Sequence, residues 1–219
     1  MKKTELAAAV TAELKKIYPE AVCALEYASD PWKLLVMARL SAQCTDKRVN
    51  AVSPALFERF PDACSMAEAD VTEIEALVRS CGLYHTKAGD IKEMSRQLVS
   101  DCGGIVPDEL DELLKLRGVG RKIANLIVGD VYGKPAVVTD THCIRICGRL
   151  GFYPETLKDP PKIEKILASV IEPAEQSDFC HRIVSFGRDV CTARSPACEG
   201  CPLSKMCKKY GNEHKGKTK

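Results

Sequence analysis

Long apolar runs are missing from this sequence. In the N-terminal stretch MKKTELAAAVTAELKK, Glu5 and Glu13 interrupt the apolar residues, so the stretch predicts neither a secretory signal nor a membrane-spanning helix. Alternating apolar and polar runs, which are typical of strands, are nearly absent, as are internal repeats and low-complexity linkers. These absences predict a soluble all-α protein that stays inside the cell and has no membrane partner.

Twelve cysteines are present in 219 residues, but their placement differs from that of a disulfide-stapled secreted protein. Eight are scattered singly, and four lie close together near the C-terminal end. A chain of this length needs no disulfides to bury a core. The pattern is typical of a reducing compartment combined with a metal site, which indicates the cytoplasm, in a bacterium close to the nucleoid.

The four clustered cysteines have the spacing C-x6-C-x2-C-x5-C. Four soft ligands this close can enclose one metal centre, either zinc or an iron-sulfur cluster, and spacing alone leaves both open. Single-zinc sites usually consist of two C-x2-C pairs, whereas only one such pair occurs here, which favours a cluster of four irons and four sulfurs. The candidate ligands are Cys191, Cys198, Cys201 and Cys207.

The formal net charge of +2 is unevenly distributed. Residues 181–219 carry nine Lys or Arg against three Asp or Glu, a net charge of +6, which leaves −4 for the rest of the chain. A basic end suits a polyanion such as DNA, although an ordinary solvated terminus has the same composition. A rigid cluster loop would also present four basic side chains to phosphate: Arg194, Lys205, Lys208 and Lys209.

Apolar residues recur at helical spacing almost throughout, as in Leu110, Leu113 and Leu114. About ten helices of ordinary length are expected, separated by turn-forming residues. The only extended-looking piece, residues 136–139, is too short to imply a sheet. The predicted breaks fall at residues 29–31, 60–62, 102–104, 133–135 and 158–161.

Two glycines interrupt the helical pattern in the segment LRGVGRK, residues 116–122. The segment lies between an acidic amphipathic helix predicted for 107–115 and an apolar helix predicted for 123–131. Gly118 and Gly120 permit a tight turn whose amides, at the positive end of the second helix, can bind a phosphate oxygen. The pattern indicates a helix-hairpin-helix that binds the DNA backbone, although a glycine pair alone also occurs in ordinary turns.

Lys122 and Asp140 are candidate functional residues near this hairpin. Lys122 follows Arg121 in the first turn of the second helix, and both positive influences disfavour protonation of its amine. A surface lysine that contacts phosphate is the alternative. Asp140, in VTDTH, follows the extended segment and starts a helix, where its carboxylate is equally suited to be an N-cap. We expect His142 to be structural, because no nucleophile lies near it in the sequence.

Together these segments resemble the endonuclease III family of DNA glycosylases over nearly the whole chain. The resemblance is carried, in order, by LSAQCTD, GLYHTKA, LRGVGRK, VTDTH and the four-cysteine loop. It implies two helical domains that flank a DNA-binding cleft. One is a six-helix barrel over 24–134 that contains the helix-hairpin-helix, and the other is an iron-sulfur cluster domain made of 1–23 and 135–219.

The resemblance also implies the activity. Members of the family remove oxidised pyrimidines such as thymine glycol and then cleave the abasic strand on its 3′ side by β-elimination. The implied catalytic residues are Lys122, as the Schiff-base nucleophile, and Asp140, and the implied cofactor is a 4Fe-4S cluster. The implied partner is double-stranded DNA that contains damaged bases or abasic sites, bound by a monomer.

The family's DNA contacts can be carried over residue by residue. Gln43 matches the glutamine that fills the space left by the flipped base, and Leu83 lies in the loop that wedges the opposite strand. Two departures occur: Arg117 stands where the family usually has proline, and Ile123 where it often has threonine. Arg117 is expected to add a cation to the hairpin and to loosen its preset geometry. The implied DNA-binding residues are Gln43, Leu83, Gly118, Val119, Gly120 and Arg121.

Two alternative functions are weighed against this interpretation. The adenine glycosylase branch of the same superfamily removes an undamaged base with water and lacks the lysine nucleophile, so Lys122 argues against it. The chain also has no residues left for that branch's additional mismatch-recognition domain. A non-catalytic DNA-binding or electron-transfer protein with a cluster would need neither Lys122 nor Asp140.

Overall fold

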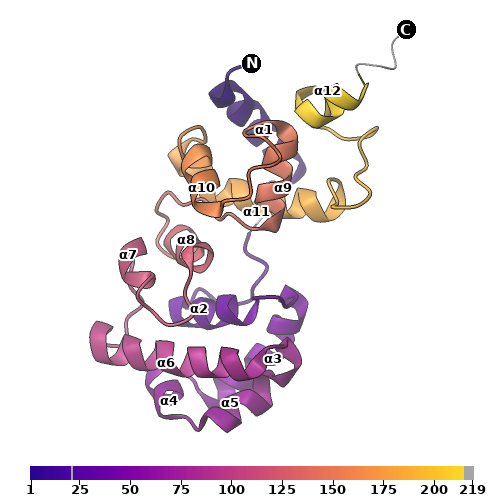
Figure 1. The fold of residues 1–219 in the computed structure, drawn as a ribbon. Coiled ribbons are helices and arrows are strands. Elements are labelled where there is room, and N and C mark those ends of the chain that lie inside the picture. The colour runs from indigo at the N-terminus through magenta and orange to yellow at the C-terminus, as the bar shows by residue number, and fades with distance from the viewer. Residues whose placement is uncertain (21, 215–219) are drawn as a thin grey trace. The chain divides into compact units, whose positions relative to one another are not determined.

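The structure is a computed structural model that describes residues 1–20 and 22–214 (Figure 1). Every regular element in this part of the chain is a helix, which confirms the all-α class. The chain divides into two compact units. We call Cys23–Gly133 the insert unit, and Met1–Val22 with Lys134–Lys219 the terminal unit. The assignment of these units to a barrel domain and a cluster domain stays a prediction at this point.

The insert unit is built around α2, which is buried on nearly all sides. Its consecutive residues 34–37 are fully buried, as expected for a helix that is apolar all round. It contacts α3, α6 and α8, while the long α6 packs against α4 and α5. The elements are α2 (Pro31–Leu40), α3 (Asp46–Arg59), α4 (Ala63–Glu68), α5 (Val71–Val78), η1 (Arg79–Cys81), α6 (Tyr84–Cys102), α7 (Leu110–Leu113) and α8 (Arg121–Asp130).

The terminal unit combines segments from both parts of its sequence range. In it α11 packs against α9 and α1, and α12 packs against α9. The buried side chain of Arg182 donates from Nε to the carbonyl oxygen of Tyr18 at 3.1 Å, which joins the two segments. The elements are α1 (Lys3–Ile17), α9 (Thr141–Leu150), α10 (Pro160–Ala168), η2 (Pro173–Glu175), α11 (Gln176–Asp189), η3 (Ser204–Met206) and α12 (Lys208–His214).

Helix starts follow the turn chemistry of the sequence. Asp30 caps α2 by accepting from the amides of Trp32 and Lys33 at 3.0 and 3.1 Å, and a proline occupies the first helical position. Asp159 caps α10 in the same way, again directly before a proline. The predicted breaks at 29–31 and 158–161 are therefore confirmed, together with their physical cause.

The helix predicted for 107–115 is wrong in extent, because α7 covers only Leu110–Leu113. The amides of Lys115 and Leu116 bond to carbonyls three residues back, which tightens the chain into a turn before the glycines. Residues 136–139 are buried without joining a strand in the described chain. Among the described helices, none has the length and apolar character needed to span a bilayer.

Candidate active site and cluster loop

The hairpin between α7 and α8 is held by its apolar residues. Leu116 and Val119 are buried, and the amide of Val119 donates to the carbonyl of Leu116 at 3.1 Å. Gly118 has a left-handed φ of 77°, which a residue with a Cβ adopts only with strain. Gly120 is the N-cap of α8 and has no side chain to cap the helix, so the positive end of α8 is left to its backbone amides.

Lys122 lies in the first turn of α8 and is exposed to solvent. The apolar side of this helix, which includes Ala124, Ile127 and Val128, is buried in the insert unit. This burial fixes the helix and leaves the Lys122 amine accessible. Lys122 therefore meets the first requirement for a nucleophile that reacts with a large substrate.

A second lysine, Lys87, is unsuited to that role. It is completely buried, and its Nζ donates to the carbonyl oxygen of Cys81 at 2.7 Å. Burial lowers the pKa of Lys87, but the amine is committed to the backbone and shielded from a macromolecule. Its evident function is to hold the turn that precedes α6.

Three charged side chains lie beneath the hairpin. Asp90 of α6 is 6% exposed and accepts from Arg39 Nε and Nη2 at 2.9 and 2.6 Å, and from Arg117 Nε at 2.8 Å. Burial alone would raise the pKa of Asp90, but the hydrogen bonds from Arg117 and Arg39 outweigh it and hold the pKa below its ordinary value. The carboxylate is therefore ionised at neutral pH, and it joins α2, α6 and the hairpin.

The backbone of Arg117 is anchored separately. Its amide donates to Gln97 Oε1 at 2.7 Å, and Gln97 Nε2 reaches the carbonyl of Lys115 at 3.5 Å. A proline at this position would have no amide to donate. The expectation that Arg117 loosens the hairpin did not include these contacts. In the structure, the guanidinium of Arg117 also donates to Asp90.

Gln43 and Leu83, the residues expected to enter the DNA helix, share an unusual backbone. Both have left-handed φ values, 54° and 48°, which are costly for residues other than glycine. Both are exposed, and Leu83 is 58% exposed despite its apolar side chain. Burial, followed by the neighbouring Cys44, raises the pKa of the Cys81 thiol to about 11, so these two cysteines, one beside each loop, lie close together within the insert unit.

Asp140 begins α9 in the terminal unit, so its N-cap role is real. Its Oδ1 accepts from the amide of Cys143 at 2.7 Å, and the side chain is partly exposed. His142 Nδ1 lies 3.2 Å from Arg145 Nη2, which also donates to the carbonyl of Cys191 at 3.0 Å. These contacts agree with a structural role for His142.

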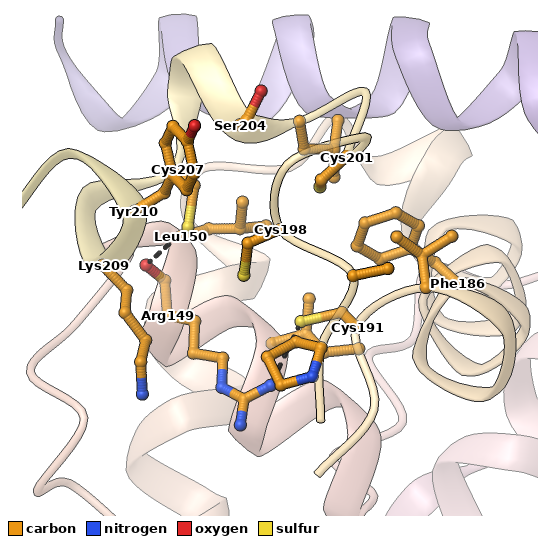
Figure 2. A pocket seen from close by; sticks show the side chains of 15 residues that line it. Arg149, Leu150, Phe186, Cys191, Cys198, Cys201, Ser204, Cys207, Lys209 and Tyr210 are labelled. Carbon is orange, nitrogen blue, oxygen red and sulfur yellow. Dashed lines mark hydrogen bonds between the residues drawn. The ribbon is translucent and has the colours of Figure 1, made fainter. Parts of the chain in front are cut away.

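The four clustered cysteines surround one cavity in the terminal unit (Figure 2). The rest of its wall is largely apolar and includes Leu150, Phe186 and Leu203. Among the described residues, no three His, Cys, Asp or Glu side chains are placed to hold a single metal ion. The four cysteines that line the cavity are Cys191, Cys198, Cys201 and Cys207.

Arg149 lies against the cluster loop as a buried cation. Its Nη1 donates to Cys191 Sγ at 3.3 Å and to the carbonyl of Thr192 at 2.8 Å, while Nη2 donates to the carbonyl of Ala193 at 2.9 Å. A buried guanidinium beside sulfur favours thiolates, the form in which cysteine binds metal. Burial raises the pKa of the Cys201 and Cys207 thiols, so a bound metal ion would be needed to hold these two as thiolates at neutral pH.

The basic side chains near this loop differ in their environments. Arg194, Lys205 and Lys208 are exposed, whereas Lys209 Nζ lies 3.7 Å from Glu155 Oε2 and 3.9 Å from Glu213 Oε1. Three of the four expected phosphate contacts are thus exposed cations, and the fourth is partly neutralised.

Comparison with known proteins identifies the family. A model of the HhH-GPD superfamily of base excision DNA repair proteins matches residues 36–173, and a model of the iron-sulfur binding domain of endonuclease III matches residues 191–207. The endonuclease III of Synechocystis sp. is 44% identical over 206 residues, which cover 94% of this chain and 93% of the relative. The chain belongs to the endonuclease III family.

Further relatives agree with this assignment. The endonuclease III of Bacillus subtilis is 40% identical over 88% of this chain and 87% of its own. A trapped covalent endonuclease III–DNA intermediate has a TM-score of 0.91 at 38% identity, and covers 97% of this chain and 99% of that one. A non-covalent endonuclease III–DNA complex has a TM-score of 0.90 at the same identity.

As a member of the endonuclease III family, the chain is a base-excision repair enzyme, both a DNA glycosylase and a lyase at abasic sites. It binds a 4Fe-4S cluster, for which the four thiols and their cavity are a suitable donor set. Sequence reasoning missed Arg39, Asp90 and Arg149. A signal was present for Arg39 and Arg149, because each is a charged residue in a largely apolar helix, whereas Asp90 lies in a helix rich in polar residues.

Proposed function

We propose that the chain removes oxidised pyrimidines of the thymine glycol type and cleaves the resulting abasic strand, with Lys122 as nucleophile. The observation that carries the assignment is the exposed amine of Lys122 in the first turn of α8, directly after the hairpin. Its competitor in the insert unit, Lys87, is buried and bonded to the backbone. The residue assignment belongs to this proposal, whereas the enzyme class follows from the family.

The proposed reaction begins with the damaged nucleotide flipped out of the duplex, which is least costly for a lesion that stacks poorly. The lone pair of Lys122 Nζ forms a bond to C1′, while the glycosidic bond breaks and the base leaves with its electrons and takes up a proton. The amine then loses a proton and the sugar ring opens at the C1′–O4′ bond, with O4′ taking up a proton. The iminium that this step forms between Lys122 Nζ and C1′ makes the 2′ proton acidic. Removal of that proton drives elimination of the 3′ phosphate.

Asp140 is proposed to stabilise positive charge on the sugar or to transfer the proton. Its cap bond to Cys143 fixes the orientation of the carboxylate on the first turn of α9. Preorientation of this kind avoids reorganisation during the reaction. Lys122 belongs to the insert unit and Asp140 to the terminal unit.

For DNA binding, we propose that the backbone amides at Gly118, Val119 and Gly120 take a phosphate, helped by Arg121. Gln43 and Leu83 are proposed to occupy the gap and the opposite strand around a flipped base. Their exposed loops, each with a left-handed backbone, suit insertion into a duplex. The partner is double-stranded DNA with damaged bases or abasic sites.

We propose that the insert unit is the six-helix barrel domain and that the terminal unit is the iron-sulfur cluster domain. Cys191, Cys198, Cys201 and Cys207 would hold the cluster, whose role is to keep the basic loop folded. The enzyme is proposed to act as a monomer in the bacterial cytoplasm, at the nucleoid, without a membrane partner. The bacterial relatives support this location.

The decisive experiment is borohydride trapping during turnover on a thymine glycol duplex. Reduction of the iminium between Lys122 and C1′ should fix a covalent protein–DNA adduct, and Lys122→Gln should abolish it. Lys87→Gln, if it folds, should still trap, because Lys87 lies in the interior. Full trapping and strand cleavage by Lys122→Gln would sink the assignment and point to another amine.

A further inference from the structure

The hairpin is tied to the protein core through Asp90. One oxygen of this carboxylate accepts from Arg39 at the end of the buried helix α2, and the other accepts from Arg117 in the hairpin. The side chains of Arg39 and Asp90 are 15% and 8% exposed, whereas that of Arg117 is 65% exposed. A chain of charged hydrogen bonds therefore runs from the core to the surface turn.

We propose that Asp90 is a positioning residue that holds the hairpin backbone in its phosphate-binding conformation. The proposal rests on the proposed function, in which the amides at 118–120 bind DNA. Gln97 assists by accepting from the Arg117 amide. The hydrogen bond between Asp90 and Arg117 restrains the hairpin backbone, as the fixed φ of a proline at position 117 would otherwise do.

Gly118 is the part of the hairpin that packs directly on Arg39 and Asp90, and its backbone needs this support. Glycine at a left-handed φ has several accessible conformations, so the turn does not hold its amides in one direction by itself. A Cβ on Gly118 would lie 2.8 Å from Arg39 Nε and 2.9 Å from Asp90 Cβ. The backbone thus rests directly on the Arg39–Asp90 pair, and charge-assisted hydrogen bonds are the strong, directional kind.

The charge of Asp90 makes the proposal testable, because a role of charge alone and a positioning role predict opposite changes in DNA affinity. A carboxylate near a phosphate-binding turn repels DNA, so its loss should strengthen DNA binding if only charge matters. A positioning residue predicts the opposite result. The neutral, isosteric Asp90→Asn should weaken binding even though the protein becomes more basic.

The test compares Asp90→Asn with Glu93→Gln, using a duplex with a tetrahydrofuran abasic analogue. Glu93 lies three residues along the same helix and pairs with Arg96. It acts on Arg117 only through its charge, so Glu93→Gln makes the same charge change without removing a hydrogen bond to the hairpin. Asp90→Asn should raise Kd about tenfold, while Glu93→Gln should leave it unchanged or lower it. In single-turnover excision, the loss should appear in the half-saturating enzyme concentration more than in the saturated rate.

A second variant covers the case in which Asp90→Asn unfolds, which circular dichroism will report. Gln97→Ala removes the bond to the Arg117 amide without changing charge or the Arg39–Asp90 pair, and should raise Kd about threefold. A DNA affinity of Asp90→Asn equal to or higher than that of Glu93→Gln would overturn the positioning role of Asp90. If Asp90→Asn cannot fold, an unchanged Kd for Gln97→Ala would overturn it instead. Failure of the unaltered enzyme to bind or excise would instead refute the proposed function.

Discussion

At the scale of single residues, Asp140 combines two separable properties, a negative charge and a helix-capping oxygen. The cap is a visible bond to the amide of Cys143, while the charge is what the proposed chemistry uses. Asparagine caps helices about as well as aspartate, and alanine does neither job. Substitutions can therefore divide the stabilising role of Asp140 from its role in the reaction.

We predict that Asp140→Asn slows base excision strongly while its unfolding midpoint stays near that of the unaltered protein. Asp140→Ala should show the same catalytic defect and also lose about 1 kcal/mol of stability, because the cap is gone. Urea unfolding and single-turnover excision measure the two effects. Equal destabilisation by both variants would contradict the separation, and so would normal excision by Asp140→Asn.

The sequence predicts individual residues well where their chemistry is local. Asp140 as an N-cap needs only its neighbours, and the four clustered thiols identify themselves by spacing. Arg39 and Asp90 are different, because they are 51 residues apart and Asp90 is 27 residues from Arg117. No local pattern pairs them, so the contacts that Arg117 makes with Asp90 could not be predicted from the sequence.

At the scale of elements, the two glycines of the hairpin have different duties. Gly118 needs its left-handed backbone and has no room for a Cβ, whereas Gly120 has an ordinary φ of −98° and open space around it. The sequence makes them look equivalent. Gly118 therefore sets the shape of the turn, whereas Gly120 lies on the surface that we propose binds DNA.

We predict that Gly118→Ala destabilises the protein by about 1–2 kcal/mol through backbone strain, with additional loss from contact with Asp90. Gly120→Val should leave the melting temperature nearly unchanged but weaken binding of damaged and undamaged duplexes alike, because the turn contacts phosphates without reading bases. Differential scanning fluorimetry and fluorescence anisotropy test the pair. A stable Gly118→Ala protein with normal DNA affinity would remove the structural role assigned to Gly118.

Two helix starts were predictable because an Asp-Pro pair marks each of them, at Asp30 and Asp159. The first helix of the hairpin was not, since its apolar spacing continues through Leu114 while the backbone has already tightened into a turn. Periodicity reports which side chains face the core, and a tight turn can satisfy the same pattern. The error therefore lies in the backbone, and of Leu110, Leu113 and Leu114 only Leu113 is fully buried.

At the scale of the whole molecule, the cluster should stabilise the terminal unit selectively. We predict about four irons per chain in protein purified without oxygen. Cys198→Ser should lower the iron content and make residues 190–207 sensitive to protease, because a missing ligand leaves the loop without its central support. Cys64→Ser, at an exposed thiol outside the cavity, is the matched control.

Iron analysis and limited proteolysis followed by mass spectrometry give the result. Fragments should begin in the cluster loop, while the insert unit stays protected. One zinc ion per chain and no iron would contradict the prediction. Equal proteolysis of the Cys64→Ser control would show that the loop is cut for another reason.

Because the insert unit interrupts the terminal unit in the sequence, the segment that is synthesised first is not the first to complete its fold. Domains usually fold as they leave the ribosome, and the insert unit is continuous, so it can fold while later residues are still being made. Helix α1 cannot complete its contacts at that stage, because the Tyr18 carbonyl at its end accepts from Arg182, which lies 164 residues downstream. Until then its apolar residues Leu6, Val10 and Leu14, all buried in the finished protein, lack the α11 surface against which α1 packs.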